Sequence, residues 1–153
     1  LWLTEPPQQR VPPADVISML TKPETSIRNF EDLSSFLQRV GFVQSQTARG
    51  AIDTLTREGA VVRVSGWAVE APAKENARGA PILVMFFSDN KNVGYIRTSG
   101  ERPDVTQALK LADAYTANTK LEGRIQCRPG SGLDISLVGL GGTYGFLGTK
   151  SCP

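Results

Sequence analysis

Six consecutive apolar residues, I-L-V-M-F-F at positions 82–87, constrain the fold of this chain more than any other feature. The run is too short to span a membrane and is flanked by turn residues, which is typical of a buried β-strand. Because successive side chains of a strand point to opposite faces, both faces of this strand are apolar. The fold must therefore cover the strand on both sides.

Apolar residues alternate with other residues in several further short stretches. The pairs Glu58-Gly59 and the sequence D-N-K-N at 89–92 are typical of tight turns and predict hairpins. Short strands joined mostly by such turns predict a mainly β fold, an antiparallel β-sandwich of the immunoglobulin-like or jelly-roll-like kind. The expected strands are 51–57, 60–70, 82–88, 93–98, 121–127, 133–140 and, seventh, 144–147.

The first third of the chain has a helical pattern. Asn29 is a good N-cap and Gly41 suits the position after the last helical residue. Pro12 and Pro13 predict a shorter helix before it. We expect residues 1–49 to form an extended lead-in and a helical segment, and residues 50–153 to form the sandwich. The apolar residues at helical spacing are Phe30, Leu33, Phe36, Leu37 and Val40.

Trp67 lies in the strand expected at 60–70. The alternating set Val62, Val64, Gly66 and Ala68 should face the sandwich core, which turns Trp67 to the opposite side unless a bulge reverses it. The helical segment has an apolar stripe that needs a partner. We therefore expect it to pack on one face of the sandwich and to form a second core with Trp67 and one face of strand 82–88. Trp67 is then a structural residue and not a platform for a ligand.

The chain contains two cysteines. Cys127 ends an expected strand and Cys152 lies in a tail that otherwise has little to anchor it. A disulfide between them would hold that tail, so we expect the bond and, with it, an oxidising compartment.

Composition excludes several kinds of site. The chain has no histidine, which rules out Ser-His-Asp and Cys-His catalysis and any histidine-ligated metal. The formal net charge is +2 and the basic residues are scattered among acidic ones, so we expect no nucleic-acid partner. We also expect no metal and no cofactor.

Three motifs are better interpreted as structural than as chemical. The glycines of 138–145 do not match a phosphate-binding loop, and no helix follows them. The sequence S-D-N-K-N at 88–92 offers oxygen ligands for calcium, but Lys91 lies among them and a hairpin turn is the better interpretation. No spacing pairs two acids for glycoside hydrolysis. The acids considered are Asp53, Glu70, Asp89, Asp104 and Asp134.

Aromatic residues on a sandwich face can stack on sugar rings, although most aromatic residues belong to cores. Tyr95 and Tyr144 are the candidate ligand contacts of this kind.

Four stretches together resemble a known module: G-A-I-D (50–53), V-S-G-W-A-V-E (64–70), V-G-Y-I-R (93–97) and E-R-P-D-V (101–105). The chain resembles, over about residues 50–147, a small Gly-Trp-Ala/Arg-x-Asp β-sandwich module attached to bacterial membrane proteins related to glycosyltransferases and polysaccharide assembly. Glu70 stands where an Asp is more usual, and Gly123-Arg124 stands where the pattern has Gly-Phe. The matching motif residues are Gly66, Trp67, Ala68, Gly94, Arg102 and Asp104.

Arg102 and Asp104 have an expected structural role without the resemblance. Asp104 lies at the start of a short helix that Pro103 opens, where a negative charge is favourable. Arg102 is expected to pair with a carboxylate or with loop carbonyl groups and so to hold the crossover between the sheets.

The resemblance implies a non-catalytic module outside the cytoplasmic membrane, periplasmic or extracellular. We expect it to bind a partner domain of the same membrane protein or a cell-envelope glycan, and to be tethered to the inner membrane. The opening L-W-L-T-E-P-P fits the exit of a membrane helix as well as an arbitrary terminus. The alternative function is a small carboxylate-dependent enzyme acting on envelope carbohydrate.

Overall fold

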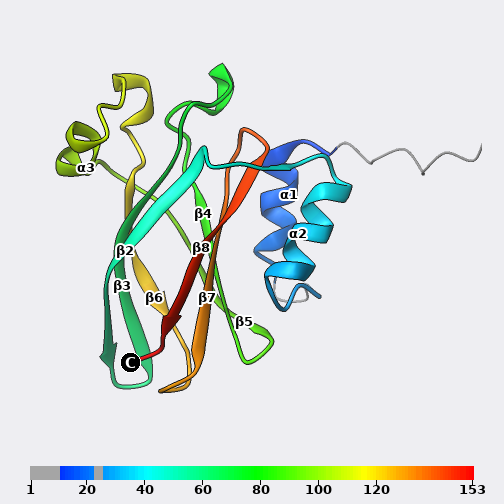
Figure 1. Cartoon of the computed structure of the whole chain (residues 1–153), viewed down its shortest axis with the longest axis vertical. Helices are drawn as coiled ribbons and strands as arrows, with labels where there is room; N and C mark the ends of the chain where they lie inside the picture. The colour runs from blue at the N-terminus through cyan, green and yellow to red at the C-terminus, as the bar shows by residue number, and fades with distance from the viewer. Residues whose placement is uncertain (1–10, 23–25) are drawn as a thin grey trace, which may run out of the picture.

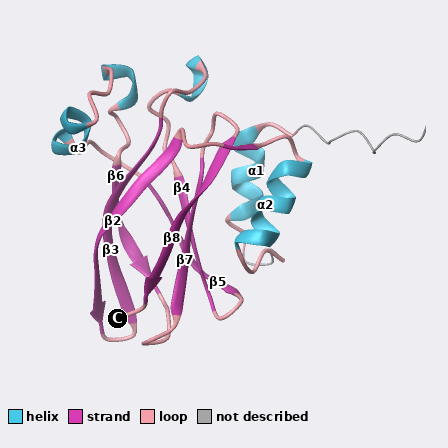
Figure 2. Cartoon of the chain, in the orientation of Figure 1, coloured by secondary structure: helices cyan, strands magenta, loops and turns pink. Residues whose placement is uncertain are grey.

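Two β-sheets pack face to face, and two helices cover the outer face of one of them (Figures 1 and 2). The computed structural model describes residues 11–22 and 26–153. The five strands of sheet A lie in the order β1 (Val43–Gln44), β8 (Thr143–Ser151), β7 (Gly132–Val138), β4 (Leu83–Ser88) and β5 (Lys91–Arg97). The three strands of sheet B lie in the order β2 (Ala48–Glu58), β3 (Val61–Glu70) and β6 (Lys120–Ile125). The helices are α1 (Pro13–Leu20), α2 (Phe30–Arg39) and α3 (Pro103–Ala108), with 3₁₀ turns η1 (Glu75–Ala77) and η2 (Asp113–Tyr115).

The expected antiparallel sandwich is confirmed. Neighbouring strands pair antiparallel in both sheets, and the short β1, which the sequence pattern did not predict, pairs parallel with β8. The β4–β5 turn has positive φ at Asp89 (53°) and Asn90 (60°), the backbone of a type I′ hairpin turn. The D-N-K-N prediction is therefore also confirmed.

Strand β4 lies between two separate cores. Val84 and Phe86 face sheet B and join the core between the sheets. Leu83, Met85 and Phe87 face the other way and join a second core with α1 and α2, which we call the helix core. All five side chains are at most 1 % exposed, so the strand has the cover on both faces that its sequence requires.

Helix α2 has the expected ends. The Asn29 side chain accepts a hydrogen bond from the Asp32 N–H at 2.8 Å, as an N-cap does. The same side chain donates to Asn90 Oδ1 at 3.0 Å, which joins the start of α2 to the β4–β5 turn. These contacts and the apolar stripe place α2 against sheet A. Within the described residues, no helix is both long and apolar enough to cross a membrane.

The predicted contact between Trp67 and the helical segment is wrong. Trp67 lies on β3 in sheet B, between Ala51 and Lys120 of the neighbouring strands, whereas α1 and α2 lie against sheet A. Its side chain faces outward, as the alternation predicts, and it is half-buried. The prediction failed because it assumed that Trp67 and strand 82–88 share an outer face. They belong to different sheets.

The expected disulfide is present. Cys127 and Cys152 are bonded, with their Cα atoms 6.2 Å apart. The bond joins the chain after β6 of sheet B to the chain after β8 of sheet A. Arg57 from β2 donates to the Cys127 carbonyl and to the Pro153 carbonyl, each at 2.6 Å, so the tail is held by a second contact.

The separation of the two cores predicts that Trp67 and the helix layer act independently on stability. We expect Trp67→Ala to lower the free energy of unfolding by about 2 kcal/mol, less than for a core Trp because the ring is half-buried. Combined with Leu37→Ala in the helix core, its effect should be additive within about 0.5 kcal/mol. Urea unfolding of the two single variants and the double variant measures the coupling.

The pair Leu37→Ala and Val138→Ala is the control for that cycle, since both residues belong to the helix core. We expect these two to be coupled. A coupling between Trp67 and Leu37 above about 1 kcal/mol would contradict the separation of the cores.

Removing the disulfide should lower the free energy of unfolding substantially. The bond joins residues 25 apart, and a loop of this size contributes about 3 kcal/mol in the chain-entropy model. We expect the Cys127→Ala/Cys152→Ala variant to have a free energy of unfolding about 3 kcal/mol lower, measured by urea unfolding. Mass spectrometry of the alkylated, unreduced protein should find no added alkyl groups, and two would contradict the bond.

Candidate functional site

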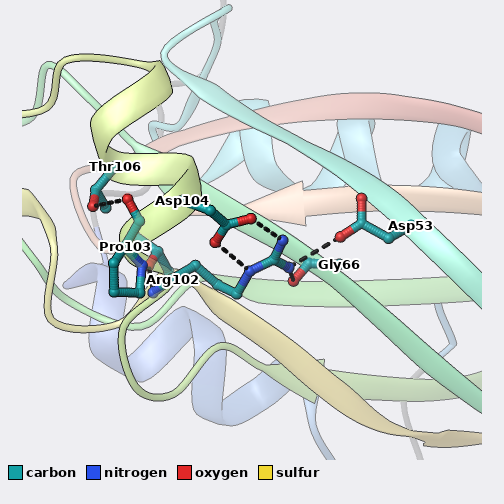
Figure 3. Close-up of polar contacts among 7 residues, drawn as sticks. Asp53, Gly66, Arg102, Pro103, Asp104 and Thr106 are labelled. Atoms are coloured by element: carbon teal, nitrogen blue, oxygen red, sulfur yellow. Dashed lines mark hydrogen bonds and ion pairs between the residues drawn. The ribbon is translucent and has the colours of Figure 1, made fainter.

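Arg102 is the centre of a polar cluster that joins three parts of the chain (Figure 3). Its guanidinium donates two parallel hydrogen bonds to the Asp104 carboxylate, at 2.9 and 2.8 Å. It also donates to Asp53 of β2 and to the Gly66 carbonyl of β3, each at 3.0 Å. The expected pairing of Arg102 with a carboxylate is therefore confirmed, and the carbonyl that it binds belongs to strand β3 and not to a loop.

The glycine of the Gly-Trp-Ala motif permits the close approach of β2 and β3 beside this cluster. A Cβ at Gly66 would collide with the Ala51 carbonyl oxygen. The register of the two strands shifts between Ile52 and Thr54, so Asp53 is the extra residue of a β-bulge. The bulge turns the Asp53 carboxylate toward Arg102. The motif stretches at 50–53, 64–70 and 101–105 thus meet in space.

Charge pairing shifts the protonation of this cluster. The hydrogen bonds from Arg102, followed by its charge, lower the pKa of Asp104 below its ordinary value. The hydrogen bonds to Asp104 and then to Asp53 raise the pKa of Arg102 above its already high value. The Arg102 side chain is 23 % exposed and both of its anionic partners already take its donors. The cluster is therefore suited to holding the chain rather than to binding an external anion.

Glu70 is buried at the end of β3, where its carboxylate is held by the glycine-rich turn between β7 and β8. It accepts hydrogen bonds from the Gly141 N–H at 2.7 Å, from the Thr143 N–H at 3.3 Å and from the Thr143 hydroxyl. A Cβ at Gly141 would meet the carboxylate at 2.7 Å, so the turn needs glycine there. The turn that lacks a phosphate-binding motif thus donates its N–H groups to a carboxylate of the same chain and ties sheet B to sheet A.

The remaining carboxylates considered for catalysis also have partners within the chain. Asp89 pairs with Arg128 at 3.1 Å, and these hydrogen bonds lower the pKa of Asp89. Asp134 accepts from the Thr149 hydroxyl at 2.7 Å. No group of three or more Cys, Asp or Glu residues in the described ranges is arranged to hold a metal ion.

The two candidate tyrosines lie in different environments. Tyr144 is fully buried, and its hydroxyl lies between Ser34 at 2.6 Å and Gln38 at 2.8 Å, both on α2. It is a residue of the helix core and has no surface for a ligand, so its assignment as a ligand contact is wrong. Tyr95 on β5 is 44 % exposed and stays a prediction.

The outer face of sheet B presents a different kind of surface. The part of this face nearer the β2–β3 turn, the lower part in Figure 1, is lined by side chains from all three strands around a groove of about 510 Å³. We call this surface the open face. Its outward side chains are Thr54, Thr56, Arg63, Ser65, Glu122 and Arg124.

The open face is ordered in rows across the strands. Ser65 lies between Thr54 and Glu122, and in the next row Arg63 lies between Thr56 and Arg124. All of these side chains are exposed except Ser65, which is half-buried. In Figure 1, α1 and α2 lie beyond sheet A and α3 lies near the upper end of sheet B. The lower part of sheet B therefore has no helix against it within the described chain.

Sequence reasoning did not identify the open face, although part of its signal is present. Polar residues at every second position of 54–56, 63–65 and 122–124 predict a solvent-facing side for each strand. Which strands are neighbours, and in what register, is decided by tertiary pairing.

No family model, curated protein or solved structure matches this chain, so similarity to known proteins assigns no function to this surface.

The Arg102 cluster predicts a pH-dependent contribution to stability. Because the pKa of Asp104 is lower in the folded chain, its contribution is present above the ordinary Asp pKa of about 3.9 and is lost as the pH falls through the folded value. We expect Asp104→Asn to unfold more easily than the wild type at neutral pH, and the two proteins to converge as the pH falls below the lowered pKa of Asp104. Thermal unfolding across this pH range is the measurement.

Glu101→Gln is the matched control, because it removes one carboxylate from the same segment without touching the Arg102 hydrogen bonds. It should leave the unfolding temperature almost unchanged. An Asp104→Asn protein whose deficit persists unchanged at pH 2.5, roughly one unit or more below the ordinary Asp pKa, would contradict the ion pair as the source of the effect.

Proposed function

We propose that this chain is a non-catalytic binding module of a bacterial cell-envelope protein, and that its open face binds a cell-envelope glycan. The module works outside the cytoplasm, in the periplasm or at the cell surface, as part of a membrane-tethered protein. The observation that carries the proposal is the open face itself, where polar side chains of three strands are displayed around a shallow groove.

The chemistry of the open face supports a sugar ligand. Its hydroxyl, carboxylate and guanidinium groups can donate and accept hydrogen bonds, which is what a hydroxyl-rich ligand requires. Rigid strands hold these groups in fixed rows, and ordered elements position a binding site more accurately than loops do. In the described residues, α1 and α2 pack instead on the outer face of sheet A, where Leu83, Met85 and Phe87 are buried.

The partners of the carboxylates support a non-catalytic role. Hydrolysis of a glycosidic bond by the usual route needs two carboxyl groups that flank one bond. Asp53 and Asp104 are taken by Arg102, Asp89 by Arg128, and Glu70 by the glycine-rich turn. Each of these groups has a structural task at a different place in the fold.

The disulfide and the resemblance support the location. Disulfides persist in oxidising compartments such as the periplasm and the cell exterior. The Gly-Trp-Ala/Arg-x-Asp pattern resembles modules of bacterial membrane proteins, which is the reason for proposing a tether.

A blocking substitution tests the proposed surface. We expect the wild-type protein to sediment with insoluble bacterial cell-wall glycan, and Ser65→Phe to reduce the bound fraction at least fivefold, because a large ring fills the groove between Thr54 and Glu122. Ser35→Phe on the exposed side of α2 is the matched control and should bind as the wild type does. Reducing ends should not appear during the incubation.

Two outcomes would contradict the proposal. Equal binding by wild type and Ser65→Phe would place the glycan elsewhere. Release of reducing ends that is abolished by changing one carboxylate would make the chain an enzyme acting on envelope carbohydrate.

A further inference from the structure

Two arginines lie directly opposite each other on the open face. Arg63 of β3 is in register with Arg124 of β6, and both side chains point away from the sandwich core. Directly opposed residues of neighbouring antiparallel strands have their Cβ atoms about 4.5–5.5 Å apart. Two guanidinium groups can therefore reach the same small anion.

This pair is unfavourable for the free protein. Like charges placed directly opposite on neighbouring strands repel each other and destabilise the pairing. Thr56 occupies the third position of the row, so no acid compensates within it. An anion from outside that lies between the two charges would remove this repulsion.

The partners available within the chain leave both arginines accessible. Arg63 is 67 % exposed and approaches Glu58 at 3.9 Å, and exposed ion pairs of this length contribute little. Arg124 makes no hydrogen bond or ion pair with the residues that the structure describes. Arg102, by contrast, has all of its partners in the chain.

The neighbouring rows limit what kind of anion fits. The next row contains two hydroxyl groups and Glu122, and the row beyond it contains Trp67 and Lys120. Glu122 and Lys120 lie about 6.6 and 13 Å along β6 from Arg124, two and four residues away at about 3.3 Å per residue. A polymer with a negative charge on every unit would place a charge near Glu122 and be repelled. A polymer whose acid groups are separated by neutral hydroxyl-bearing units would match the rows.

We propose that Arg63 and Arg124 together bind a carboxylate group of an acidic polysaccharide. The hydroxyl groups of Thr54 and Ser65 donate hydrogen bonds to the adjacent sugar or accept them from it, and the Glu122 carboxylate accepts them from sugar hydroxyls. Each guanidinium offers paired N–H donors that match the two oxygens of a carboxylate. This inference rests on the proposed glycan-binding function and names the class of glycan.

Affinity electrophoresis in gels that contain a dissolved polymer tests the inference. The probes are hyaluronate, with a carboxylate on alternate sugars, polygalacturonate, with one on every sugar, neutral pullulan, and single-stranded oligothymidylate. We expect hyaluronate to retard the wild-type protein most strongly, and the Arg63→Gln/Arg124→Gln variant to bind it at least tenfold more weakly. The retardation should fall as salt is added, because the contacts are exposed charges.

Arg28→Gln/Arg39→Gln is the matched control, since it removes the same charge from the helix layer, away from the open face. It should keep its hyaluronate binding. The Arg63→Gln/Arg124→Gln variant should unfold at the same urea concentration as the wild type or at a higher one, because the repulsion between the arginines is gone. That result would separate a loss of binding from a loss of folding.

The other outcomes separate this inference from the proposed function. If the wild type binds neither hyaluronate nor polygalacturonate, the proposed acidic ligand is wrong. The proposed glycan-binding function then survives only if pullulan or cell-wall glycan still binds and Ser65→Phe abolishes that binding. Stronger retardation by oligothymidylate than by either acidic polysaccharide overturns the inference in favour of nucleic acid. An equal loss of binding in the control variant would show that overall charge, and not the Arg63–Arg124 pair, causes the binding, and would overturn the inference.

Discussion

Strand β4 must be covered on both of its faces, and the rest of the structure is arranged around that requirement. Its inward side chains pack between the sheets, and its outward ones pack under α1 and α2. A strand of six side chains that are all buried needs two layers, one on each side. Sheet B supplies the first layer and the helical segment supplies the second. The helices are therefore part of the core and not an appendage to the sandwich.

Polar contacts then fix how the two sheets meet at their ends. At one end the Glu70 carboxylate of sheet B is bound by the turn between β7 and β8 of sheet A. At the other, the disulfide and Arg57 hold the tail that follows β8. Arg102 joins β2 and β3 to the segment that enters α3. Each contact uses a charge or a covalent bond where apolar packing gives no direction.

The same arrangement leaves one sheet surface uncovered. Sheet A has apolar contacts on both faces, whereas the outer face of sheet B carries hydroxyl and charged groups over its lower part. Half-buried Trp67 lies on this outer side, at the upper border of the polar rows. The indole belongs neither to the core between the sheets nor to the helix core.

The local sequence determined most of the strands and helices, and the residues that cap a helix or form a turn. The double-sided apolar run, the Asn29 cap, the Asp89-Asn90 turn and the tail cysteine follow from propensity and alternation, and the structure contains each of them. Only the tertiary structure decided which strands share a sheet. That choice removed Trp67 from the helices, buried Tyr144 beneath α2 and set Arg63 opposite Arg124. Alternation tells which side of a strand a residue occupies, but the neighbour across the strand depends on pairing between segments far apart in the chain.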